Sequence, residues 1–434
     1  MGLEQRILEA IESGREELVE LVSRLVAFDT TAREVDDQPR DEADLQAYLG
    51  DRLRVAGATV DIWEPRPQDV AGSRQMPPGL TFDGRPQMAA SFAGSGGGPS
   101  LLLNGHIDVV PSAPRDRWTS DPNRPEVRDG NLYGRGTCDM KGGVACMVYA
   151  AEVLARLGVK LAGNIVVNTV TDEESSGAGG LAAARHGVRA DAGIVPEPTA
   201  FEVWVACRGS LTPTITVEGR PGHAEMAQPH WKDGGAVNAI EKMSVVLDAV
   251  RRLREEWMGR PDKRHPHLSS GTIVPVKISG GEWAVTYPAS CSLTCEVMYL
   301  PGNADDDGWG REVEAEIEAW IAAAAAADPW LVLHPPAIEW ALDIPPAEVD
   351  AAHPIVEAVA KASAAAGEPP SLGGLDSWFD AATFTRFADT PSIGFGPRSL
   401  AWGHTIDEYV PVDDLVSCTQ ALALAAVDYC GVAG

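Results

Sequence analysis

Continuous apolar runs that end in polar residues are the feature that most restricts how this chain can fold. The runs and the polar residues that follow them are Leu101–Leu103 before His106, Ile165–Val167 before Asp172-Glu173-Glu174, and Ala192–Val195 before Glu197. Such runs are typical of strands buried on both faces, as in parallel sheets covered by helices. The carboxyl ends of parallel strands share one crevice in an open α/β sheet. The sequence therefore predicts that these polar residues meet.

Acidic residues that converge in this way call for a cation. Packed carboxylates repel one another and take up protons unless a divalent metal is present. Asp139 and His404, which lie in Gly/Pro-marked turns, are further candidate ligands. Two divalent ions would set four positive charges against the carboxylates of Asp139, Glu174 and Glu197, leaving about one charge that a hydroxide would cancel. The charge balance predicts a two-metal hydrolase site.

Two acidic residues beside the candidate ligands have separate predicted roles. Asp108 follows His106 by two positions, where its carboxylate can hold the second ring N–H and fix the tautomer. Adjacent Glu173 and Glu174 point in different directions in an extended segment, so one can bind metal while the other reaches the reacting water. The residues alone leave open which of the two does which.

Length, charge and cysteine content narrow the class of protein. A chain of 434 residues exceeds the size at which one core stops growing, which predicts two domains. The formal charge of −28 argues against nucleic acid and anionic membranes as partners. Seven cysteines without a C-x-x-C pair suit a reducing compartment. No signal core or membrane-spanning apolar run is apparent, so we expect a cytoplasmic protein.

The hydrophobic pattern divides the chain into an outer and an inserted part. In the outer part we expect one long helix over Leu3–Ala27 and a surface loop over Pro65–Gln87. From residue 209 an alternating pattern gives a β-α-β-β-α-β order, with its last strand near Trp330–His334. We predict an α/β catalytic domain over residues 1–208 and 342–434, with a mixed, mostly parallel sheet flanked by helices. Residues 209–341 are predicted to form an inserted α+β ferredoxin-like domain.

Several segments together resemble one enzyme family. They are Gly105–Pro111, Gly134–Gly143, Asp172–Glu174, Glu197–Thr199, Gly222–Ala224 and His404–Glu408. In this order, over nearly the whole chain, they are similar to the zinc-dependent deacylases and exopeptidases that include acetylornithine deacetylase, succinyl-diaminopimelate desuccinylase and glutamate carboxypeptidase. The resemblance implies a zinc exopeptidase-like catalytic domain with an inserted lid through which the protein forms a homodimer.

The resemblance also implies a metal-ligand set. Asp139 would bridge two zinc ions, with cobalt or manganese as possible substitutes. His106 and Glu197 would complete one site, and Glu174 and His404 would complete the other. In this family a glutamate at position 197 goes with deacylases and carboxypeptidases, which favours an N-acyl bond as the target.

The resemblance assigns catalytic roles to residues that do not bind metal. Glu173 would be the general base, and Asp108 would support His106 from behind. His223, in the inserted domain, would reach across the dimer to the scissile carbonyl.

The expected substrate pocket departs from the family pattern. Where the family has an asparagine and an arginine that face a substrate carboxylate, this chain has Val285 and Met298, which cannot bind one. Arg398 is a candidate replacement, because an arginine fork suits a carboxylate. Trp402 suggests an apolar or aromatic substrate. We expect hydrolysis of a small N-acylated or carbamoylated substrate without the usual α-carboxylate contact. A dipeptidase or carboxypeptidase and a non-catalytic binding protein are the alternatives.

Overall fold

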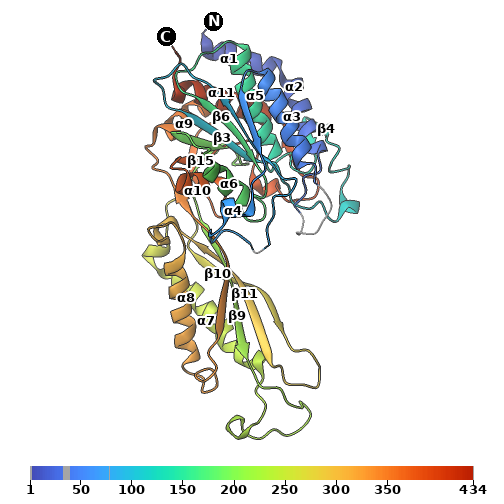
Figure 1. The fold of residues 1–434 in the computed structure, drawn as a ribbon, viewed down its shortest axis with the longest axis vertical. Coiled ribbons are helices and arrows are strands. Elements are labelled where there is room, and N and C mark those ends of the chain that lie inside the picture. Colours follow the sequence, from blue (N-terminus) through green and yellow to red (C-terminus); the bar gives the residue numbers. More distant parts are fainter. Residues whose placement is uncertain (1, 33–39, 78, 434) are drawn as a thin grey trace. The chain divides into compact units, whose positions relative to one another are not determined.

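Two units make up the computed structural model, which describes residues 2–32, 40–77 and 79–433. Unit 1 comprises Met1–Ala206, Ala347–Gly374 and Phe379–Gly434, and unit 2 comprises Cys207–Pro346 with Leu375–Trp378 (Figure 1). The inserted unit is thus slightly longer at both ends than the predicted residues 209–341. It also takes up a short segment from the C-terminal part of the chain.

Unit 1 is built on a mixed, mostly parallel sheet, as predicted. Its strands, in the order in which they pair, are β1 (Thr59–Trp63), β2 (Gln87–Phe92), β6 (Ile165–Val170), β3 (Leu101–His106), β7 (Ala192–Val195), β15 (Ser392–Gly394), β8 (Glu202–Cys207) and β13 (Ala347–Glu348), with β14 (Ser371–Leu375) beside β8. Strands β6, β3, β7 and β15 run parallel to one another. Every residue of β3 and β7 is buried, because helices cover both faces of the sheet.

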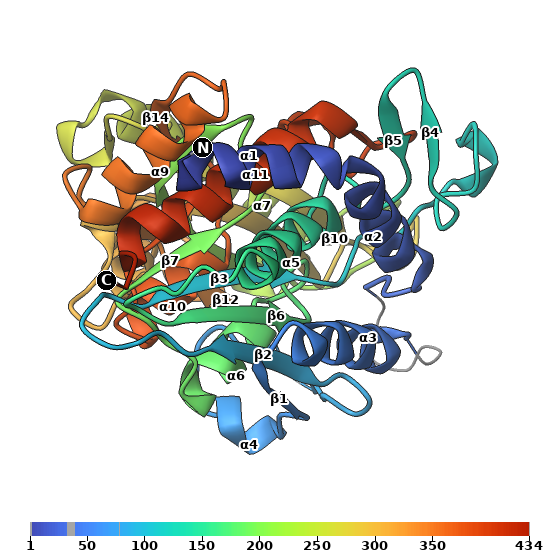
Figure 2. The same cartoon turned by 90° about the horizontal axis from the view of Figure 1, so that it is seen from above.

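Helices form the two outer layers of unit 1. They are α1 (Leu3–Ser13), α2 (Arg15–Ala27), α3 (Glu42–Val55), α5 (Lys141–Arg156), α6 (Ala178–His186), α9 (Pro354–Ala365), α10 (Asp380–Phe387) and α11 (Val412–Cys430). Helices α5 and α11 lie on one face of the sheet, and α3 and α6 lie on the other (Figure 2). A small sheet of β4 (Glu126–Arg128), β5 (Asn131–Tyr133) and β16 (Tyr409–Pro411) lies at the side.

Two predictions for the N-terminal part of unit 1 were wrong in detail. The single helix expected over Leu3–Ala27 is two helices that meet at Gly14, where a side chain would collide with the hydroxyl of Tyr149. The loop expected over Pro65–Gln87 contains the short helix α4 (Pro67–Val70) and buries Val70 and Phe82 against α6. Proline and glycine in this segment interrupt strands without keeping the chain at the surface.

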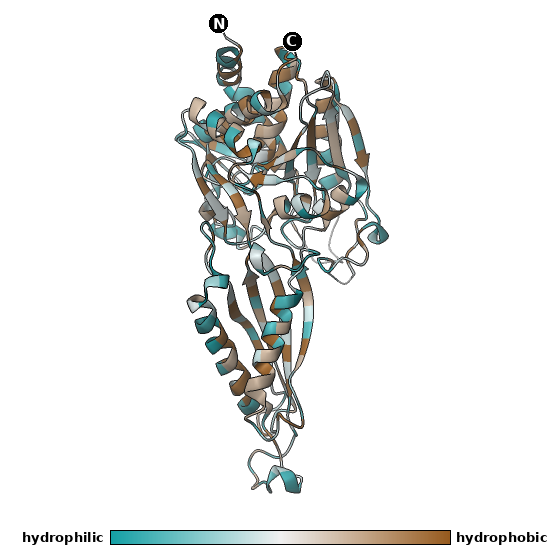
Figure 3. Ribbon diagram, turned by 90° about the vertical axis from the view of Figure 1, so that its left-hand side faces the viewer, coloured by the Kyte–Doolittle hydropathy of each residue, from teal (hydrophilic) through white to brown (hydrophobic). Residues whose placement is uncertain are grey.

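Unit 2 has the predicted ferredoxin-like order of elements. They are β9 (Gly209–Glu218), α7 (Ala239–Gly259), β10 (Thr272–Gly280), β11 (Ser290–Tyr299), α8 (Arg311–Ala325) and β12 (Ala337–Ile344). The strands pair antiparallel in the order β10-β11-β9-β12. Burial alternates along β9 and β11, as expected for a sheet with one face packed on helices, and the strands carry both hydrophobic and hydrophilic residues (Figure 3).

The last strand of unit 2 was predicted in the wrong place. Residues 330–334 form turns, because the carboxylate of Asp328 accepts the backbone N–H groups of Trp330 and Leu331. The strand is β12, which follows Pro335 and Pro336. No helix within residues 2–32, 40–77 and 79–433 is both long and apolar enough to cross a membrane.

Candidate metal centre

The five candidate ligands all lie in unit 1, on loops at the ends of buried elements. His106 is the last residue of β3, Glu174 follows β6, and Glu197 follows β7. Asp139 lies two residues before α5, and His404 lies between β15 and β16. The carboxyl ends of the parallel strands β3, β6 and β7 therefore meet as the apolar runs predicted.

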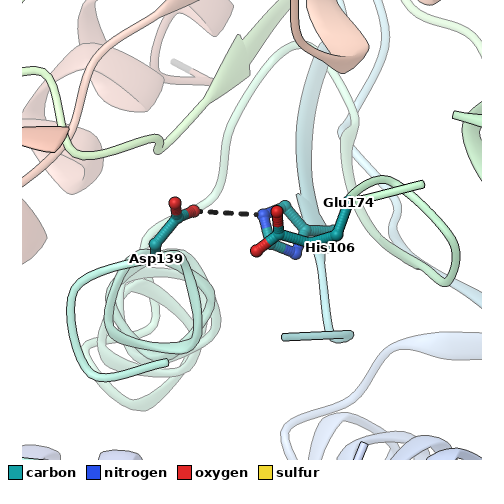
Figure 4. Close-up of side chains that lie close together, drawn as sticks. All are labelled: His106, Asp139 and Glu174. Atoms are coloured by element: carbon teal, nitrogen blue, oxygen red, sulfur yellow. Dashed lines mark hydrogen bonds and ion pairs between the residues drawn. The ribbon is translucent and has the colours of Figure 1, made fainter. Parts of the chain in front are cut away.

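Asp139 lies between the two histidines. Its Oδ1 is 3.3 Å from Nε2 of His106, and its Oδ2 is 3.3 Å from Nε2 of His404. Glu197 Oε1 lies 3.9 Å from the same nitrogen of His106, and Glu174 Oε2 lies 3.0 Å from that of His404. The donor atoms thus form two groups that share one carboxylate. His106, Asp139 and Glu174 each offer an atom within 4.8 Å of the others (Figure 4).

Burial and charge in this cluster oppose each other. Burial raises the pKa of Glu197 well above its usual range, and burial also raises the pKa of Glu174. Hydrogen bonds to the histidines outweigh burial at Asp139 and lower its pKa. Hydrogen bonds with Asp139 and Glu174 raise the pKa of His404 to about 10. Without metal, the histidines are therefore held in their protonated form, so that protons supply the positive charge that the carboxylates require.

Asp108 supports the centre through contacts that differ from the predicted one. Nδ1 of His106 lies 2.9 Å from the main-chain oxygen of Asp108 and 3.7 Å from its carboxylate. The carboxylate instead accepts the backbone N–H groups of Glu173 at 3.3 Å and Glu174 at 3.1 Å. The ring nitrogen still has an oxygen partner, while the side chain of Asp108 fixes the loop that carries both glutamates.

Glu173 is the buried acid that faces the same imidazole as the ligands. Its side chain is 10% exposed, and its Oε2 lies 3.9 Å from Nε2 of His106. Burial raises the pKa of Glu173 well above its usual range, and the charge of Glu197 raises it further. Burial thus favours the protonated form of Glu173, and a general base must be able to accept a proton.

The contacts of three other predicted site residues are separate from those of the five candidate ligands. His223 is in unit 2, on an exposed turn that pairs with Thr286. Trp402 is 43% exposed, two residues before His404. The guanidinium of Arg398 lies 4.7 Å from the ring of Trp402 and 4.3 Å from that of Tyr409, to whose hydroxyl it donates a hydrogen bond. Arg398 is therefore held by aromatic neighbours.

Sequence reasoning missed several buried polar residues that fix the ligand loops. Arg85 donates to Asp172 at 3.1 Å, at the start of the Glu173 loop. Lys141 donates to the main-chain oxygens of Leu25 and Phe28, and burial lowers its pKa to about 7. The carboxylate of Glu408 accepts three N–H groups of the Asp139 loop. Lys141 and Glu408 are charged residues within the segments Gly134–Gly143 and His404–Glu408 that resemble the family. This position was the sequence signal that could have indicated their roles.

Comparisons with known proteins show the family to which this chain belongs. Residues 102–428 match peptidase family M20/M25/M40. Succinyl-diaminopimelate desuccinylase of Methylorubrum populi is 30% identical over 394 residues, covering 86% of this chain and 90% of that protein. The chain is thus a hydrolase of amide bonds, an amidohydrolase, with the fold and loops of a metal-dependent enzyme. More particularly, it belongs to peptidase family M20/M25/M40, which confirms the predicted family.

Two further proteins extend the similarity to the full length. N-formyl-4-amino-5-aminomethyl-2-methylpyrimidine deformylase of Bacillus subtilis is 27% identical over 438 residues, covering 97% of this chain and 96% of that protein. Human carnosine dipeptidase 1 shares the fold with a TM-score of 0.72 at 15% identity, over 99% of both chains. The match therefore includes both units.

Proposed function

We propose that this protein hydrolyses the N-acyl amide of a small molecule at a centre of two divalent ions, zinc in the first place. The position of Asp139 carries this proposal. One carboxylate oxygen of Asp139 faces each histidine at 3.3 Å. Each histidine also has a glutamate beside it as a second carboxylate, Glu197 at His106 and Glu174 at His404. A carboxylate that presents its two oxygens to two separate donor groups has the arrangement of a bridging ligand.

The residues present fit two divalent ions. Oε1 of Glu197 is buried and has no hydrogen-bond partner among the described residues, although buried carboxylate oxygens are normally paired. Imidazole and carboxylate donors suit zinc, and manganese and cobalt also accept them. In this arrangement His106, Asp139 and Glu197 would hold one ion, and Glu174, Asp139 and His404 the other. Bound ions of this kind activate water and draw charge from a carbonyl group.

Two side chains would act directly on the reacting atoms. Glu173 would accept a proton from the attacking water at its carboxylate and then release it to the departing nitrogen. Its buried position favours the protonated form between these steps. His223 of the second copy in the proposed dimer would donate a hydrogen bond to the carbonyl oxygen, where negative charge develops during attack.

The substrate proposed is an aromatic or otherwise apolar amine that carries a small acyl group. Val285 and Met298 offer no charge to a carboxylate. Arg398 lies against the rings of Trp402 and Tyr409, which are tilted by 60° to each other, beside His404 in sequence, and such a group of aromatic and guanidinium planes suits a flat ring. The Bacillus subtilis relative is by name a deformylase of an aminomethylpyrimidine, which supports this class. A peptide with a free α-amino group is the second candidate, supported by the dipeptidase fold.

Unit 2 supports a proposal of homodimerisation. Strand β10 is at the edge of its sheet, and β11 is its one neighbouring strand among the residues that the structure describes. Its side chains Val276 and Ile278 are 59% and 53% exposed, and Ile240 on α7 is 46% exposed. Exposed apolar edge strands invite pairing with another chain, and natural monomers protect them. Two copies of β10 would pair about a two-fold axis.

A substrate panel with metal analysis tests the proposed function. We expect the purified protein to hold zinc and to hydrolyse N-formyl and N-acetyl aromatic amines. Their kcat/KM should exceed that of N-acetyl and N-succinyl amino acids by about tenfold or more, the value of a missing charged hydrogen bond. Chelation should remove activity, and zinc, cobalt or manganese should restore it. A folded protein that neither binds these metals nor hydrolyses any amide in the panel would refute the proposal.

A further inference from the structure

Glu408 is a buried carboxylate with no part in the chemistry described above. Its side chain is 0% exposed, and it lies four residues after His404, directly before β16. Strand β16 pairs with β5, so that Tyr409 is opposite Tyr133. Glu408 therefore lies where the segment that carries His404 meets the segment that leads to Asp139.

Every hydrogen bond found for the Glu408 side chain comes from the Asp139 loop. Its Oε1 accepts the backbone N–H groups of Gly136 at 3.0 Å, Cys138 at 2.8 Å and Asp139 at 3.0 Å. Its Oε2 accepts Nη1 of Arg135 at 2.5 Å. Its main-chain oxygen accepts the N–H of Gly134 at 2.9 Å. Glu408 thus accepts hydrogen bonds from every residue between Gly134 and Asp139 except Thr137.

The residues from Arg135 to Met140 and from Gly403 to Asp407 form turns and bends and belong to no helix or strand. Gly136 has a φ of 86° and His404 a φ of 57°, in the left-handed region that non-glycine residues rarely adopt. The N–H groups of Gly136, Cys138 and Asp139 converge on one point, which a carboxylate fits well. Without that carboxylate they would be buried donors with no partner, an arrangement that folded proteins avoid.

The two loops also touch at the ligands themselves. Oδ2 of Asp139 lies 3.3 Å from Nε2 of His404. A Cβ atom on Gly403 would lie 2.9 Å from the same oxygen, closer than real contacts allow. The two loops are therefore closely packed at this point. A small shift of one loop changes the distance between Asp139 and His404.

We infer that Glu408 is a positioning residue for the metal centre, which ties the Asp139 loop to the His404 segment and so sets the distance between these ligands. The inference rests on the proposed function, because it concerns ligands of the proposed ions. Partners that orient metal ligands from behind typically contribute a factor of about 10 to 100 in metal affinity.

The first test uses metal-free protein and the variant Glu408→Gln. The amide has the same size as the carboxylate, but its NH2 group is a donor. This NH2 group would face either the guanidinium of Arg135 or the backbone N–H groups of the loop, which are also donors. We expect hydrogen exchange at Gly136, Cys138 and Asp139 to be faster than in the wild type, while the helices of unit 1 keep their protection. Unchanged exchange at these three amides would overturn the inference, whatever the protein catalyses.

The second test measures zinc affinity by competition with a chelator. We expect Glu408→Gln to bind zinc about 10- to 100-fold more weakly than the wild type. The matched control is Glu152→Gln on α5, which removes another buried glutamate, 3% exposed, that Arg52 and Arg156 bind. The control should keep wild-type zinc affinity. Equal affinities in Glu408→Gln and the wild type would contradict the inference, whereas a wild type without zinc would contradict the proposed function.

A milder variant covers the case in which Glu408→Gln does not fold. Arg135→Lys leaves the carboxylate and its three backbone bonds in place and weakens the contact at Oε2, together with the contacts of Arg135 with the main-chain oxygen of Pro111 and the ring of Trp118. We expect zinc affinity to fall by less than in Glu408→Gln but in the same direction, with exchange at Cys138 and Asp139 slightly faster. Wild-type behaviour in both measurements would speak against Glu408 as the residue that holds the loop.

Discussion

The two units of this protein bury charged side chains to different extents. In unit 1 the interior contains many charged residues, and several of them belong to the candidate metal centre or bind its loops. Those 5% exposed or less are Glu42, Asp108, Arg135, Asp139, Lys141, Glu152, Asp172, Glu197, Asp380 and Glu408. Unit 2 buries Trp257, Leu253 and Val250 completely in its apolar core cluster, and its charged residues at the same level of burial are fewer, namely Lys263 and Asp343. Unit 2 instead exposes apolar side chains on β10.

Each unit therefore has one unfavourable feature that it does not resolve alone. Buried carboxylates cost free energy unless they are paired or bind a cation. Exposed apolar edges cost free energy unless another surface covers them. We therefore expect that an ion stabilises the buried carboxylates of unit 1 and that a protein surface covers the exposed apolar edge of unit 2. Each half of this statement can be tested separately.

The largest expected effect concerns Glu173, the acid of unit 1 that we propose as the general base. Glu173→Ala should retain zinc but lose turnover by about 100- to 10,000-fold, the usual contribution of a general base. Asp139→Ala should lose both zinc and turnover, because Asp139 is the ligand that we propose both ions share. Zinc analysis and steady-state kinetics on both variants measure the contrast. Normal turnover in Glu173→Ala would show that this acid is buried for structural reasons.

Much of the fold followed from the sequence because burial leaves a direct pattern. The uninterrupted apolar run Leu101–Leu103 and the alternation in β9 indicated the two kinds of sheet. The break at Gly14 could not be predicted, since its cause is the hydroxyl of Tyr149, distant in sequence. The position of β12 was missed because the apolar residues 330–333 resemble a strand, while Asp328 turns the chain through backbone contacts.

The candidate metal ligands were easier to predict from the sequence than the residues that fix the position of their loops. His106 and Glu197 end apolar strands, and their residue types restrict the chemistry. Glu408 was part of a matching motif, but its binding to three backbone N–H groups depends on a loop about 270 positions earlier. Backbone partners carry no residue type, so sequence patterns do not reveal them. The contact of Asp108 with the Glu173 loop was missed for the same reason.

A smaller effect is expected from the exposed edge of unit 2. The double variant Val276→Lys with Ile278→Lys should convert a dimer into a monomer, since charge on an edge strand prevents pairing. Sedimentation at several concentrations measures the change. Val127→Lys in unit 1 is the matched control, because Val127 is 51% exposed on the short strand β4, and it should remain dimeric. A wild type that sediments as a monomer would remove the proposed partner of unit 2.

The smallest expected effect is a pH dependence of the metal-free protein. Hydrogen bonds with Asp139 and Glu174 raise the pKa of His404 from 6.5 to about 10. Between these values the folded state keeps a proton that the unfolded chain releases. The resulting contribution to the free energy of unfolding is therefore complete below pH 6.5 and is lost as the pH rises to about 10.

Two measurements check this dependence. The imidazole of His404 should titrate near pH 10 by NMR in metal-free protein, and Tm should fall more steeply between pH 7 and pH 10 than in His404→Gln. The effect is small, since the side chain of His404 is 52% exposed and solvent weakens its ion pairs. Zinc should abolish the titration, because a metal-bound imidazole is neutral. If His404 titrates near pH 6.5 without metal, the acids of unit 1 do not act on it, and their burial needs no cation to explain it.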